Sequence, residues 1–195
     1  MRLRAAALSG LCCLAQGCGA PVTKSAPVVE PCAVALDLVI GTVAHFRGRA
    51  VVFSDEDEGL MPPSVDTKGW YGPEALQPVA VSPPPAALVD RLNRTRAVSA
   101  VASCPAVRAW LDKAGIAHGA KAVDRAVDPR RMTAQGYAET VLGVSVPVVS
   151  ADGADALVLT HNVSAPLGGG GQANRLRRGA NGRWTVVAIR GLWVS

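Results

Sequence analysis

Aromatic residues are scarce in this chain: they make up 4% of its 195 residues, as two Phe, two Tyr and four Trp. Proteins that bind single-stranded nucleic acid stack bases on aromatic side chains and surround the phosphates with clustered basic residues. Here the formal charge of +5 is mild, and the basic residues are scattered along the chain. We therefore expect no nucleic-acid partner.

Long apolar runs are absent after the first eighteen residues. A membrane-spanning helix needs a run of about 18 or more apolar residues, so we expect no spanning helix in the mature protein. Hydrophobic residues make up 49% of the chain and charged residues 18%. This composition is typical of a folded globular protein, and the length suits one domain with a hydrophobic core.

Metal-binding and phosphate-binding motifs are lacking as well. His45, His118 and His161 form no His-x-x-x-His pair, and none lies near a cysteine at the spacing of a zinc site. The acidic run 55–58 lacks the spacing of a calcium loop and indicates a solvated turn. The glycines 168–171 are not followed by the Lys-Ser or Lys-Thr of a phosphate-binding loop, and they indicate a flexible connection between strands. We expect no metal and no cofactor.

The N-terminus has the order of an export signal. Arg2 and Arg4 are followed by an apolar run at 5–14 and by small residues before Cys18. The apolar run is about ten residues, too short to span a bilayer as a helix. The segment therefore predicts a signal peptide over residues 1–17, and its removal lowers the charge to about +3.

Cys18 directly follows the small Gly17, as the lipidated cysteine of a bacterial lipoprotein does. The sequence departs from that pattern at Ala15 and Gln16, where a Leu and a small residue are usual. We expect lipid attachment at Cys18, so that a lipid anchor joins the protein to a membrane of the bacterial envelope. Either the periplasm or the outer-membrane surface fits this expectation. Residues 18–31 are rich in Pro and small residues and predict a tether.

Two cysteines are left once the signal and Cys18 are set aside. Cys32 and Cys104 form an even pair, and an exported protein meets an oxidising environment. The sequence allows a disulfide between them, which would stabilise the fold by about 4 kcal/mol on the chain-entropy model. The alternative is two free, buried thiols.

The rest of the chain, residues 32–195, predicts a single α+β domain. Helices are expected at 33–44, 86–94 and from Pro105 to Gly115, which is a helix-ending residue. Strands are expected at 50–53, 141–149, 156–164, 173–178 and 183–194. Short connections make the last four strands an antiparallel meander, and we expect the N-terminal helices to pack on one of its faces.

Strict alternation along the last strand divides its side chains between two faces. Trp184 and Trp193 should lie on opposite faces. Arg190 interrupts the face that holds Trp184, so the face of Ile189 is the better candidate for the core under the helices.

The C-terminal third is similar to the end of a loose group of exported bacterial proteins. The similarity covers Ala156–Leu159, the glycines 168–171, Asn181–Val187 with its Gly-x-Trp-x-Val pattern, and the terminal Leu192–Ser195. It implies the meander and an exported location. Members of the group often carry two cysteines around the glycine loop, which this chain lacks, and the group implies no activity.

His161 is the leading candidate for chemistry. It lies on a predicted strand near Asp152 and Asp155, and a hydrolase would need it to contact a serine such as Ser145 or Ser164. The segment around Ser145 lacks the Gly-x-Ser-x-Gly elbow of many hydrolases. A histidine that is hydrogen-bonded at the sheet is the alternative.

Taken together, these features predict a non-enzymatic envelope protein whose domain binds another envelope component. An exported hydrolase using His161 is one alternative. The other is a ligand-pocket domain of NTF2-like type, which requires an apolar cavity of about 300 Å³ or more between sheet and helices.

Overall fold

The computed structural model describes residues 29–57, 59–60, 64–73 and 81–195. The predicted signal peptide, Cys18 and most of the predicted tether lie outside these residues. No helix of the described part is both long and apolar enough to cross a membrane.

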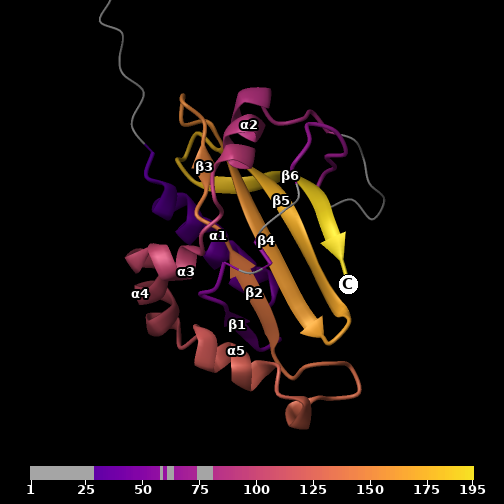
Figure 1. The fold of residues 1–195 in the computed structure, drawn as a ribbon. Coiled ribbons are helices and arrows are strands. Elements are labelled where there is room, and N and C mark those ends of the chain that lie inside the picture. Colours follow the sequence, from indigo (N-terminus) through magenta and orange to yellow (C-terminus); the bar gives the residue numbers. More distant parts are fainter. Residues whose placement is uncertain (1–28, 58, 61–63, 74–80) are drawn as a thin grey trace, which may run out of the picture.

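A mixed sheet runs through the domain (Figure 1). Its strands are β1 (Val51–Phe53), β2 (Thr140–Val144), β3 (Val148–Val149), β4 (Asp155–Ala165), β5 (Gly168–Arg178) and β6 (Trp184–Val194). The order is β1-β2-β4-β5-β6, and β3 also pairs with β4. β2, β4, β5 and β6 are antiparallel neighbours, whereas β1 is parallel to β2. The α+β class and the antiparallel meander are confirmed, and β1 adds a parallel strand at its edge.

The helices begin and end at residues that favour helix termini. They are α1 (Pro31–His45), α2 (Ala86–Arg94), α3 (Ala100–Ser103), α4 (Pro105–Ala114), α5 (Ala120–Ala126) and the 3-10 helix η1 (Pro129–Arg131). Proline, whose missing N–H costs nothing at a helix start, opens α1 and α4. Gly115 ends α4 in the left-handed conformation, with φ of 67°. The Ser99 hydroxyl accepts hydrogen bonds from two backbone N–H groups at the start of α3.

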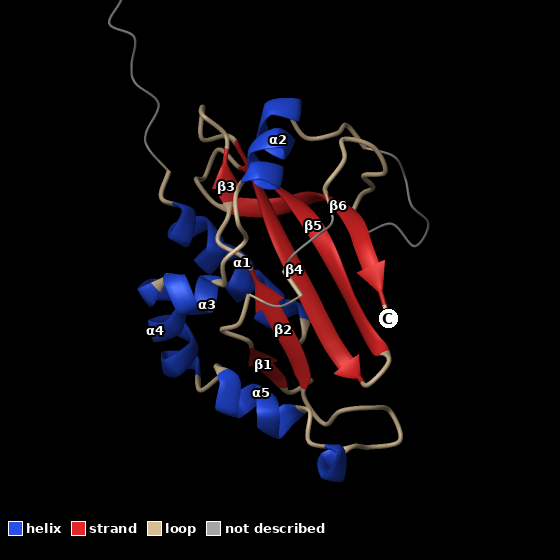
Figure 2. Cartoon of the chain, in the orientation of Figure 1, coloured by secondary structure: helices blue, strands red, loops and turns tan. Residues whose placement is uncertain are grey.

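Helices cover both faces of the sheet, so the expectation of one covered face is wrong. α1, α3 and α4 bury one face together with Phe53, Val158 and Leu176. α2 buries the other face around Leu157, together with Leu60, Val65 and Trp70, and α5 extends this cover toward β1 and β2. Figure 2 shows α2 in front of the sheet and α1 behind it. We call these sides the α1 face and the α2 face.

A β-bulge in β6 explains why strict alternation assigns its faces wrongly. The register with β5 shifts between Arg175 and Leu176, which leaves Val187 as an extra residue. Val186 therefore packs against the core of the α1 face, whereas Ala188 is buried in the core of the α2 face. Ile189 pairs with Asn174 and returns to the α1 face.

The glycines at 168–171 form the beginning of β5 and not the predicted loop. The chain reverses between Ala165 and Gly168. The Trp193 ring occupies the space where a side chain at Gly171 would lie. A larger residue at that position would collide with the indole, so glycine permits this packing inside the strand.

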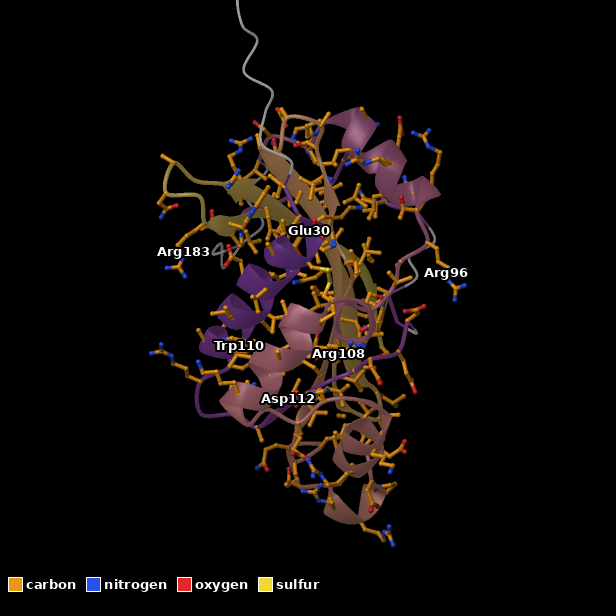
Figure 3. The ribbon with its side chains drawn as sticks, turned by 90° about the vertical axis from the view of Figure 1, so that its left-hand side faces the viewer. Glu30, Arg96, Arg108, Trp110, Asp112 and Arg183 are labelled. Carbon is orange, nitrogen blue, oxygen red and sulfur yellow. A yellow bond between two sulfur atoms is a disulfide. The ribbon has the colours of Figure 1, made fainter. Side chains whose placement is uncertain are left out.

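Cys32 and Cys104 are joined by a disulfide, with 5.4 Å between their Cα atoms. Cys32 lies in the first turn of α1, and Cys104 immediately precedes α4. Figure 3 shows α1 and α4 side by side, and the bridge fixes the start of this pair. A disulfide suits an exported protein, because such bonds persist in oxidising compartments.

Candidate functional site

A groove of about 680 Å³ lies between α1 and the sheet. We call it the α1 groove. One wall is the side of α1 that presents Asp37, Gly41 and His45 at helical spacing. The other wall and the floor are residues of β2, β4, β5 and β6. The volume falls within the range of small-molecule sites, about 300–1,000 Å³.

Three polar side chains form a hydrogen-bonded row on the groove floor. Gln172 Nε2 donates to Asn174 Oδ1 at 3.1 Å, and Asn174 Nδ2 donates to Thr160 Oγ1 at 2.8 Å. The row, which we call the amide ladder, forms because Thr160 pairs with Gln172 across β4 and β5, and Asn174 follows two residues later on the same face. Asn174 is 3% exposed, so its amide is held firmly in place.

The remaining lining is mainly apolar. Trp184, Val186 and Ile189 of β6 border the groove, and all three are half-buried. The backbone N–H of Trp184 donates to Asp37 Oδ2 at 3.3 Å, which ties β6 to α1 at one end of the groove. Phe46 borders the groove just beyond the end of α1.

The groove carries little charge. Among its described lining residues, Asp37 is the one carboxylate, His45 is an exposed histidine, and no Lys or Arg is present. A bound anion would therefore find no Lys or Arg side chain as a partner among these residues. The arrangement favours ligands without negative charge.

A smaller hollow of about 390 Å³ lies beside the start of α1. Its lining comes from Pro31, from Arg91 and Thr95 near the end of α2, and from the chain around 147–153. It has no row of buried polar side chains comparable to the amide ladder. We therefore take the α1 groove as the candidate site.

His161 lies on the α2 face, opposite the amide ladder. Its ring occupies the space where a side chain at Gly143 would lie, and Nδ1 is 3.0 Å from the position that a Cβ at Gly59 would take. Side chains alternate along β4, so the His161 ring points away from the α1 groove. Only the backbone of His161 borders the groove. The residue is 8% exposed, and burial lowers the pKa of the imidazole.

The predicted hydrolase partners of His161 have other roles. The Ser145 hydroxyl accepts the Leu159 N–H at 2.9 Å, and Asp155 pairs with Arg175 at 2.8 Å. Ser164 donates to the Gly168 carbonyl. Within the described chain, Nδ1 of His161 has no hydrogen-bond partner. The structure thus brings no Ser-His-Asp arrangement together there.

The acidic run 55–58 serves as a structural turn where it is described, and Glu58 lies outside the described residues. Asp57 Oδ1 accepts the Ser99 N–H at 2.8 Å, which fixes the loop to the start of α3. No group of three His, Cys, Asp or Glu residues in the described part is placed to hold a metal ion.

Sequence reasoning missed the amide ladder, although a signal for it exists. Thr160 and Asn162 are two residues apart in one predicted strand, and Gln172 and Asn174 are two residues apart at the start of the next, so each pair lies on one face. Polar side chains that gather on one face of neighbouring strands indicate a face that is not fully covered. The contribution of α1 to the groove has no comparable local signal.

The chain was compared with protein-family models, with curated proteins and with solved structures, and none of these comparisons found a match. The functional argument therefore rests on the site itself.

Proposed function

We propose that this chain is an exported bacterial envelope protein, anchored by lipid at Cys18, whose α1 groove binds a small ligand without transforming it. The observation that carries the proposal is the groove of about 680 Å³ with the amide ladder on its floor. Apolar walls around a few fixed polar groups are the usual composition of a ligand site. The N-terminal signal, the disulfide and the C-terminal resemblance support the exported location.

We propose that the α1 groove binds its ligand and does not catalyse a reaction, for a chemical reason. Acyl transfer or hydrolysis needs a nucleophile, or a water, beside a base. The groove's described lining offers the hydroxyls of Thr42, Thr160 and Thr185, and none of them hydrogen-bonds to a histidine or carboxylate. Its one carboxylate, Asp37, already accepts the Trp184 N–H. This favours the ligand-pocket alternative over the hydrolase alternative.

Gly41 provides a direct test of the groove. It lies on the groove side of α1 and is exposed, and a Cβ built there meets no atom within 4 Å. Gly41→Phe therefore adds a ring to a lining position of the groove where the Cβ itself has room, and it removes a poor helix former from α1. Gly41→Ala also replaces the glycine with a better helix former but leaves the groove open.

The measurement is the fluorescence of N-phenyl-1-naphthylamine, an apolar probe that brightens on leaving water. We expect the wild-type chain and Gly41→Ala to bind it alike, and Gly41→Phe to bind about tenfold more weakly or worse. Ala109→Phe, which adds the same ring to the exposed side of α4, is the control and should bind like wild type. Equal binding by a folded Gly41→Phe variant, or no binding by wild type, contradicts the proposal.

A further inference from the structure

We infer that the α1 groove selects a neutral ligand that carries hydroxyl and amide groups on one side and an apolar face on the other, the chemistry of an N-acetylated sugar. This inference rests on the proposed function, because it names the ligand class of the same groove.

The first argument is charge. An ion that leaves water for a partly closed groove needs an opposite charge to offset its desolvation. No Lys or Arg lines the groove in the described chain, so carboxylates and phosphates have no lysine or arginine counter-ion there. Asp37 is the one carboxylate, and its Oδ2 already accepts the Trp184 N–H. A neutral ligand loses the least hydration free energy when it enters the groove.

The second argument is the hydrogen-bonding capacity of the amide ladder. Each side-chain amide carries two N–H donors and an oxygen with two lone pairs, and a hydroxyl both donates and accepts. The two internal bonds use one N–H of Gln172 and one of Asn174. Among the described residues no further side-chain hydrogen bond uses the second N–H of each amide, the Gln172 carbonyl or the Thr160 hydroxyl hydrogen, which leaves them for a ligand. Donors and acceptors thus stand side by side, as they also do in an acetamido group beside a hydroxyl.

The third argument is the set of apolar and aromatic side chains that line the groove beside this row. Trp184 is half-buried at the groove, and Val186 and Ile189 continue the same side. An indole ring presents a flat apolar surface with a negative face, against which the C–H face of a sugar ring can pack. Phe46 supplies a second aromatic side chain to the lining. The groove therefore combines an amide row with aromatic surface.

The test is calorimetric titration of the full mature chain with the uncharged N-acetylglucosamine trimer. We expect saturable binding, and about tenfold weaker binding of cellotriose, which has the hydroxyls but lacks the acetamido groups. Gln172→Ala and Thr160→Val should each weaken binding of the trimer by about five- to tenfold through a lost hydrogen bond. Gln135→Ala makes the same change at an exposed loop position and should bind like wild type.

The outcomes separate this inference from the proposed function. If N-phenyl-1-naphthylamine binds and Gly41→Phe abolishes its binding, but the trimer neither binds nor displaces it, the ligand class is wrong and the groove still functions. If octylamine displaces the probe but neither the trimer nor 1-octanol does, the ligand class is wrong and the groove prefers a cation, with Asp37 as the counter-ion. If the wild type, Gln172→Ala and Thr160→Val bind the trimer equally well, the amide ladder does not contribute hydrogen bonds to trimer binding. If wild type binds neither the trimer nor the probe, the proposed function itself fails.

Discussion

Removing the Cys32–Cys104 disulfide should destabilise the domain strongly. The bridge joins residues 72 positions apart in the sequence. On the chain-entropy model a closed loop of that length removes enough freedom from the unfolded chain to stabilise the fold by about 4 kcal/mol. Since small domains are stable by about 5–15 kcal/mol, the loss is a large part of the total.

The assay is urea unfolding of the oxidised wild type, the reduced wild type and the Cys32→Ala/Cys104→Ala variant. With a slope of about 2 kcal/mol per molar urea, the midpoint should fall by about 2 M in both altered samples. Cys104 is fully buried, so the double variant also loses packing, and the reduced wild type isolates the cross-link itself. Thiol titration of the unfolded oxidised chain should find neither cysteine free.

A fall of less than about 1 kcal/mol in the reduced sample would refute the loop-closure reasoning. The single variants provide a further check. Because either substitution breaks the same bond, Cys32→Ala and Cys104→Ala should each cost nearly as much as the double variant. Additive losses would show that the two cysteines act independently and not as a bridge.

Two further predictions concern His161 and Cys18. Burial lowers the pKa of His161 below its ordinary 6.5, so the unfolded chain takes up the proton first as the pH falls. Stability should therefore be highest above pH 6.5 and should decline below it. Urea midpoints from pH 8 to 5 should show this decline, and His161→Phe should flatten it; an unchanged profile in the variant would contradict the assignment to His161. Labelling with a fatty acid should mark the expressed protein, and Cys18→Ser should lose both label and membrane association; an unlabelled, soluble wild type would point to a plain secretory signal.

The sequence predicted the local elements well because their ends depend on individual residues. The helix from Pro105 to Gly115 follows from the fixed φ of proline and the left-handed conformation that glycine adopts at a helix end. The predicted helix at 86–94 matches α2. The antiparallel order of the last four strands follows from connections too short to cross the sheet.

Properties that depend on the partner strand were harder to predict from the sequence. The bulge at Val187 reverses the alternation for Ala188 and Ile189, and no residue type at that position signals it. The glycines at 168–171 suggested a loop because glycine in a strand is unfavourable, but packing of Trp193 over Gly171 compensates in the folded chain. Both errors arose where a cross-strand contact overrides a local preference.

The α1 groove shows why the site itself was the hardest feature to predict. Its floor comes from residues near 160 and 174, its apolar wall from β6, and its other wall from Asp37 to His45. More than 110 residues of the chain separate α1 from β6. The two walls meet because α1 packs across the sheet. A polar face on two strands indicates an incompletely covered sheet, but only the position of α1 turns that face into a groove. The disulfide that anchors the first turn of α1 therefore helps to shape the site as well as to stabilise the fold.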